Sequence, residues 1–109
     1  MQTLGEKLGH IVIPLATPFK ETTQDLDLDA AAALVDHVIS NKLCDSLIVG
    51  GTSGEFNALS LDERRELFRA VKDAAAGRVP LVGGACSSAT REAVELARLS
   101  ERLGFDAIM

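Results

Sequence analysis

The chain contains no tryptophan and no tyrosine, and four phenylalanines are its only large aromatic side chains. Its apolar residues are mainly leucine, valine, isoleucine and alanine, within a hydrophobic fraction of 47%. That fraction is too high for a disordered chain. The composition favours buried parallel strands covered by helices over a β-sandwich. A length of 109 residues suffices for one small domain.

Cysteine is scarce as well. The two cysteines, Cys44 and Cys86, lie far apart in the sequence and form no C-x-x-C motif, and neither has metal-ligand residues grouped around it. We therefore expect two small buried apolar side chains in a reducing compartment, rather than a disulfide or a metal site.

Long apolar runs and an excess of positive charge are also missing. No run is long enough to cross a bilayer, and the start "MQTLGEKLGH" lacks the pattern of a signal peptide. A net charge of −5 argues against nucleic acid and acidic membranes as partners. We expect a cytoplasmic protein that binds neither nucleic acid nor membrane.

What the chain does have is an alternation of apolar runs with segments of helical periodicity. Strands are predicted at residues 10–17, 46–51, 79–85 and 105–109. Helices are predicted at residues 25–42, 60–77 and 87–104. The order βαβαβαβ requires parallel strands joined by right-handed crossovers.

Local signals predict how the helices begin and end. Ser60 stands three residues before Glu63, which predicts a capping box, and Gly77 is expected to end that helix. Ser87 or Ser88 is the expected N-cap of the next helix. The buried face of the second helix is expected from Leu67, Phe68, Val71 and Ala75. The charged run Glu63-Arg64-Arg65 is expected to be solvated, with Glu63 capping.

Two α/β architectures satisfy this order: a doubly wound open sheet, or the first half of a (β/α)₈ barrel. The fourth strand has no helix after it, so its faces are half covered and one edge is unpaired. We interpret residues 1–109 as a partial TIM-barrel domain, the N-terminal half of the barrel truncated in the fourth strand. Such a chain belongs to a longer protein or completes itself by oligomerising.

The segment "GGTSGE" (50–55) follows the second predicted strand, at the end where parallel α/β folds bind ligands. Glycines allow close approach of a ligand, and exposed N–H groups in such a turn attract anions. The hydroxyls of Thr52 and Ser53 add neutral donors. The segment is therefore either a structural turn or a site for a carboxylate or phosphate. It lacks the lysine of a phosphate loop and the G-x-G-x-x-G spacing of a dinucleotide site.

Three quoted segments carry a resemblance to a known family. In order they are "IVIPLATPF", "GGTSGEFNALSLDERRELFRAV" and "GRVPLVGGACSSATREAVELARLSERLGFDAIM". Together, from about residue 11 to residue 109, they resemble the N-terminal part of the dihydrodipicolinate synthase / N-acetylneuraminate lyase family. The resemblance implies a lyase, a class I Schiff-base aldolase on a (β/α)₈ barrel. Such enzymes act on pyruvate or another 2-keto acid without a metal or other cofactor, and a homo-oligomer is expected.

The resemblance also implies roles for individual residues. In the family a lysine forms an imine with the keto acid and a tyrosine shuttles protons. Thr52 would join that proton relay, and Thr52 and Ser53 would bind the substrate carboxylate. The family often has threonine where Ser53 stands, and serine keeps the hydroxyl. Supporting positions around the turn fall on Thr17, Gly51, Gly54 and Glu55.

The chain departs from the family in two respects. It has no tyrosine, and the family's Schiff-base lysine belongs to later strands, so we expect the 109-residue chain alone to be inactive. At positions of the family's lysine feedback site, Phe56, Leu61 and Ser88 replace polar ligands while Glu92 matches, which puts feedback in doubt. The alternative is a non-catalytic half-barrel that binds a small carboxylate or self-assembles. A flavodoxin-like or nucleotide-binding domain is a third hypothesis.

Overall fold

The computed structural model describes all residues from Met1 to Met109, and it confirms the predicted alternation of strands and helices. The strands are β1 (Val12–Pro14), β2 (Ser46–Val49), β3 (Leu81–Gly83) and β4 (Ala107–Ile108). The main helices are α2 (Leu28–Ser40), α3 (Leu61–Ala75) and α4 (Thr90–Arg102). Two short elements were not predicted, namely α1 (Leu4–Leu8) and the 3₁₀ helix η1 (Phe56–Ala58).

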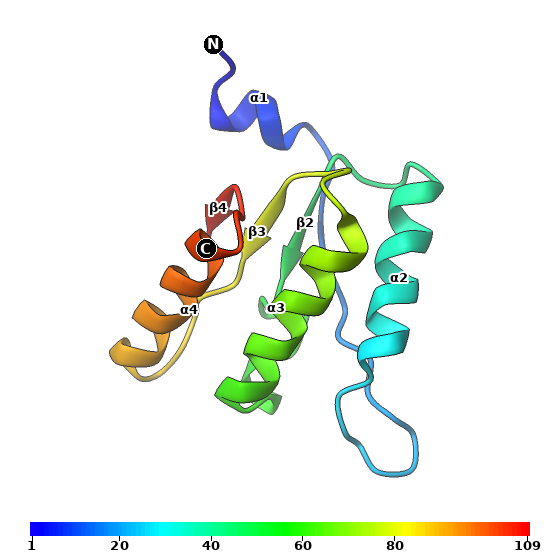
Figure 1. Ribbon diagram of the computed structural model, residues 1–109, viewed down its shortest axis with the longest axis vertical. Helices are drawn as coiled ribbons and strands as arrows, with labels where there is room; N and C mark the ends of the chain where they lie inside the picture. The colour runs from blue at the N-terminus through cyan, green and yellow to red at the C-terminus, as the bar shows by residue number, and fades with distance from the viewer.

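The four strands form one parallel sheet in the order β1-β2-β3-β4. Figure 1 shows α2, α3 and α4 side by side over the same face of this sheet, with α1 beyond the amino ends of the strands. Consecutive strands that are neighbours, with every crossover helix on one face, make the N-terminal half of a (β/α)₈ barrel. A doubly wound sheet would have helices on both faces.

The predicted strands were too long. β1 has three residues where eight were predicted at residues 10–17, because the apolar run continues past the ladder into the loop that packs on the core. Leu15 and Thr17 lie in that loop and are 3% and 6% exposed. Burial in a loop produces the same apolar pattern as burial in a strand, so pattern alone could not find the boundary.

Hydrogen bonds at the start of α3 confirm the predicted capping box. The Ser60 hydroxyl accepts from the Glu63 N–H at 3.1 Å, and the Ser60 N–H donates to the Glu63 carboxylate at 2.8 Å. At the other end Ala76 takes the left-handed conformation with φ 52° and Gly77 follows with φ 74°, so the helix ends two residues earlier than predicted.

The predicted cap of α4 was wrong. Its N-cap residue is Ala89, which has no capping side chain. The Ser87 hydroxyl is used in the preceding turn instead, where it accepts from the Ala89 N–H at 3.2 Å and donates to Glu92 at 2.9 Å. Ser88 is exposed.

The core lies between the sheet and its helices. The predicted face of α3 is fully buried, and the Phe68 ring stacks on Phe105 with 5.3 Å between ring centroids. Cys44 and Cys86 are free thiols and only half-buried, so the expected full burial was wrong. No helix combines the length and the apolar character needed to cross a membrane.

Polar contacts hold the N-terminal segment against the amino ends of the strands. The Asp45 carboxylate accepts from the N–H groups of Ile11 and His10, each at 2.8 Å. These two bonds lower the pKa of Asp45, since they favour its charged form. Lys7 of α1 forms an ion pair with Asp106, just before β4.

The capping box predicts a measurable loss of stability. Ser60→Ala removes the hydroxyl acceptor of the box, so it should lower the free energy of unfolding by about 1 kcal/mol in urea denaturation. Ser88→Ala is the matched control, because that side chain is exposed and lies outside the helix cap. Equal effects of the two substitutions would contradict this account of the helix start.

Candidate functional site

The segment of residues 50–55 forms a tight turn at the carboxyl end of β2. The Gly54 N–H donates to the Gly51 carbonyl at 3.1 Å, and the Glu55 N–H donates to the Thr52 carbonyl at 3.0 Å. These two bonds place Thr52 and Ser53 at the tip of the turn, where both side chains are exposed. Neither of their backbone N–H groups donates to another backbone group of the chain. The tip therefore offers two free N–H donors and two accessible hydroxyls.

Glycines bring this turn close to the neighbouring strands. A Cβ at Gly84, just after β3, would lie 2.2 Å from the Gly50 carbonyl oxygen, so only glycine permits this approach of the two strand ends. A Cβ at Gly54 would lie 3.2 Å from the Thr17 hydroxyl. The Thr17 hydroxyl, from the loop after β1, therefore lies next to the turn.

Gly51 and Glu55 lie on either side of the tip of the turn. A Cβ at Gly51 would lie 3.1 Å from the Met109 side chain, so the turn also contacts the last residue of the chain. Glu55 has φ 56° in the left-handed region, and its exposed side chain does not cap η1. The roles of Thr17, Gly51 and Glu55 toward a ligand stay predictions.

The expectation that Arg64 is solvated was wrong. Its side chain is 4% exposed, and its guanidinium donates to the carbonyls of Gly84 and Cys86, each at 2.6 Å. It also lies 4.9 Å from the centroid of the Phe56 ring. Arg64 therefore ties the loop after β3 to the segment that follows the turn.

Helical phase is the signal that would have identified Arg64. It precedes Leu67, Phe68 and Val71 by three, four and seven residues, so it shares their buried face. Arg65 points elsewhere and forms ion pairs with Asp62 and Glu95 at the surface. Burial lowers the pKa of Arg64, an effect that nearby Cys86 and Glu92 oppose. An arginine stays charged under such conditions.

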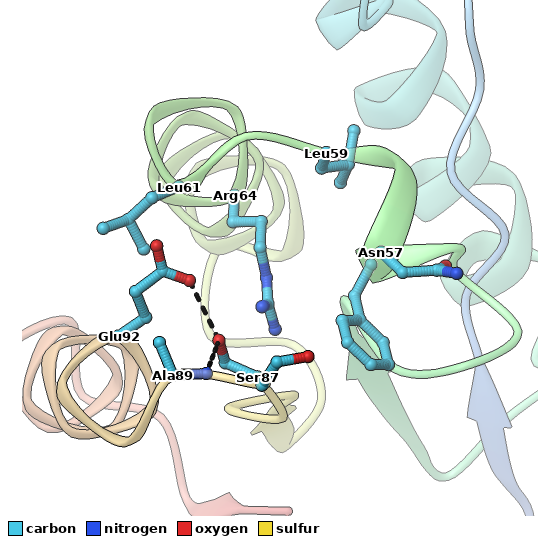
Figure 2. A pocket seen from close by; sticks show the side chains of 9 residues that line it. Asn57, Leu59, Leu61, Arg64, Ser87, Ala89 and Glu92 are labelled. Carbon is cyan, nitrogen blue, oxygen red and sulfur yellow. Dashed lines mark hydrogen bonds between the residues drawn. The ribbon is translucent and has the colours of Figure 1, made fainter.

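A cavity of about 230 Å³ lies between η1, the start of α3 and the loop before α4. Figure 2 shows Arg64 and Glu92 on its walls, with Glu92 hydrogen-bonded to Ser87. Its lining also includes Phe56, Leu61 and Ser88. The structure therefore brings together Phe56, Leu61, Ser88 and Glu92, the four positions that the resemblance associates with a feedback site.

Every lysine of the chain is either exposed or in contact with an acceptor oxygen. Lys20 and Lys42 are exposed, Lys7 pairs with Asp106, and the Lys72 ammonium lies 3.4 Å from the Gly104 carbonyl oxygen. The histidines, His10 and His37, are exposed.

The fold and the placement of the turn define the class of this protein: a βα half-barrel whose candidate ligand site lies at the carboxyl ends of its strands. Residues 7–109 match the Dihydrodipicolinate synthetase family. The chain belongs to that family.

Curated relatives agree with this assignment. The chain is 45% identical over 102 residues to 4-hydroxy-tetrahydrodipicolinate synthase 1 of Halalkalibacterium halodurans, an alignment that covers 94% of this chain and 34% of the relative. It is 40% identical over 98 residues to 4-hydroxy-tetrahydrodipicolinate synthase of Synechococcus sp., covering 90% and 31%. The chain thus spans about a third of the length of the curated relatives it matches.

Solved structures give the same result. N-acetylneuraminate lyase from Mycoplasma synoviae superposes with a TM-score of 0.90 at 30% identity, covering 94% of this chain and 35% of that one. A dihydrodipicolinate synthase from Cyanidioschyzon merolae, solved with lysine bound, superposes with a TM-score of 0.84 at 40% identity, covering 93% and 34%.

The buried position of Arg64 predicts a large effect of mutation. Arg64→Met keeps most of the side-chain volume but leaves two carbonyls without their donor, so it should lower the free energy of unfolding by about 3 kcal/mol in urea. Arg65→Met should cost at most about 1 kcal/mol, because its ion pairs are at the surface. A ranking with Arg65 the costlier of the two would contradict the role assigned to Arg64.

Proposed function

We propose that this chain is the N-terminal segment of a Schiff-base lyase that acts on pyruvate or another 2-keto acid, and that residues 50–55 bind the substrate carboxylate. The observation that carries the proposal is the tip of the turn, where the backbone N–H groups of Thr52 and Ser53 remain free. Family membership supports the class of reaction. The longer protein is proposed to be a cytoplasmic homo-oligomer.

The chemistry of the turn suits a carboxylate. Its donors are neutral, so they hold an anion by hydrogen bonds without forming the strong ion pair that would slow product release. In the proposed mechanism the Thr52 hydroxyl passes a proton between the reacting carbon and a tyrosine of the longer protein, and the Ser53 hydroxyl binds a carboxylate oxygen. A lysine would form the imine, whose positive charge accepts the electron pair of the carbon–carbon bond that breaks in cleavage, or of the carbon–hydrogen bond that breaks before condensation. In condensation the resulting enamine donates that pair to form the new carbon–carbon bond.

Neither the tyrosine nor a suitable lysine belongs to this chain. An imine-forming lysine needs a desolvated site or a cationic neighbour to be unprotonated at neutral pH. Two of the four lysines here are exposed, and the other two contact acceptor oxygens. The proposal therefore assigns binding to the 109-residue chain and catalysis to the longer protein.

The first test is binding. Pyruvate should shift the amide NMR signals of Thr52 and Ser53 with a dissociation constant on the order of 1 mM, as expected for a few hydrogen bonds to a small ligand. Pyruvamide, in which a neutral amide replaces the carboxylate, is the control ligand and should shift them little. Equal responses to both ligands would contradict carboxylate binding at the turn.

The second test is covalent trapping. Pyruvate with borohydride should leave the intact mass of the 109-residue chain unchanged, because no lysine is set to form an imine. A chimera that continues this chain with the remaining two thirds of the Halalkalibacterium halodurans relative should gain one reduced pyruvate adduct.

Variants of that chimera separate the two hydroxyl roles. Thr52→Val should slow turnover about 100-fold, as expected when a proton relay is lost. Ser53→Ala should instead raise KM about tenfold, the effect of one lost hydrogen bond. A folded chimera that forms no adduct would favour the alternative function, a non-catalytic half-barrel that binds a small carboxylate. The observation behind this alternative is that the free N–H donors at the tip of the turn can bind an anion without a lysine or a tyrosine.

A further inference from the structure

A charged cavity of about 300 Å³ lies at the surface between helices α3 and α4, which Figure 1 shows side by side. Its lining consists of Arg65 from α3 and of Glu95, Arg98 and Arg102 from α4. None of these side chains is apolar, whereas most pockets for organic ligands are lined mainly by hydrophobic residues. Both helices belong to this chain, so the walls of the α3–α4 cavity do not depend on further strands at either edge of the sheet.

Two of the three arginines in this lining have no acidic partner. Arg65 is paired twice, with Asp62 at 2.6 Å and with Glu95. Arg98 and Arg102 take part in none of the four ion pairs of the chain. They stand four residues apart on α4, so they share one face of the helix and their like charges repel each other. An anion held between them would remove that repulsion.

The positive charge extends along both helices beyond the cavity. Arg69 follows Arg65 by four residues on α3, and Arg91 precedes Arg98 by seven residues on α4, so each continues the same side of its helix. Both of these side chains are exposed. This concentration of arginine occurs in a chain whose net charge is −5. The local field between α3 and α4 therefore attracts anions, although the chain as a whole repels them.

We propose that the α3–α4 cavity binds a phosphate dianion, either free or as the terminal group of a small phosphate monoester. Arg98 and Arg102 supply two unpaired positive charges, which match the two negative charges of the ligand. A guanidinium donates two parallel N–H bonds to phosphate oxygens, which a lysine ammonium cannot do. Arg65 is a third donor, and Glu95 limits its contribution by pairing with it.

This site is separate from the turn at residues 50–55. The turn lies at the carboxyl end of β2, whereas the cavity lies between two helices. The inference therefore does not depend on what the turn binds. The cavity has room for a small phosphorylated molecule, and the net charge of −5 opposes a long polyanion such as nucleic acid.

Equilibrium dialysis with radiolabelled inorganic phosphate tests the proposal, both on the 109-residue chain and on the chimera described above. The dissociation constant should be on the order of 1 mM at low salt for each protein. It should rise when sodium chloride is added, because the arginines are at the surface. Absence of phosphate binding to both proteins would overturn the proposal.

Amide NMR signals of the 109-residue chain locate the bound phosphate. Phosphate should shift the signals around Arg98 and Arg102, and acetate, a carboxylate with a single charge, should shift them little. Phosphate shifts confined to Thr52 and Ser53 would show that the turn is the only anion site, and they would overturn the proposal.

The double variant Arg98→Gln with Arg102→Gln removes both unpaired charges and should raise the dissociation constant at least about tenfold. Lys20→Gln with Lys42→Gln is the matched control. It makes the same change in net charge at two exposed positions outside α3 and α4, so it should leave phosphate binding unchanged. Equal effects of the two double variants would show non-specific attraction instead of a site. Far-UV circular dichroism checks that the helices are kept.

Glu95→Gln gives a test in the opposite direction. It releases Arg65 from an ion pair and removes the one negative charge of the lining, so the dissociation constant for phosphate should fall about threefold. Weaker binding by this variant would contradict the role assigned to the arginines. Glycerol 3-phosphate distinguishes the sources of the dianion: tighter binding than inorganic phosphate assigns the site to a monoester, and equal binding assigns it to the phosphate group alone.

Discussion

The packing of α3 against the centre of the sheet is the contact on which the rest of this structure depends. Phe68 lies at its middle and is fully buried. Its ring sits 3.1 Å from the position of a Cβ at Gly50 and stacks on Phe105 ahead of β4. One side chain thus connects the central helix, the start of the ligand turn and the last strand. Burial of such a ring stabilises the fold by roughly 2–3 kcal/mol.

Arg64 extends that contact from the core to the candidate site. It stands one helical turn before Phe68, and its guanidinium reaches two carbonyls that have left the β3 ladder. The two terminal nitrogens of the guanidinium make these bonds, whereas its buried Nε has no hydrogen-bond partner. The same bonds hold the loop after β3 next to the turn after β2. The geometry of the turn therefore depends on a residue that lies outside the turn.

The (β/α)₈ architecture also explains why helices cover one face of this sheet and not the other. Each βα unit buries the helix-facing side of its strand as it forms, so four units complete a core between sheet and helices. The interior of a barrel is different, because it fills only when all the strands are present. Relatives about three times as long have further chain for this purpose.

Much of the fold could be predicted from local pattern. The apolar face of α3, its capping box and the alternation of strands and helices depend on residues near one another in the sequence, and they were correct. The boundaries of β1 and the cap of α4 were not, because buried loops imitate strands and the Ser87 hydroxyl had a competing partner in Glu92. For the site, the sequence indicated the turn and its hydroxyls but not which groups surround them.

What the sequence determined by itself is the alternation of elements, the family resemblance and the donors at the tip of the turn, since each is a property of short segments. Only the tertiary structure decided that Arg64 is buried while Arg65 is at the surface, and that Thr17 lies under Gly54. These features join residues from different strands and helices, so they exist only once the chain has packed.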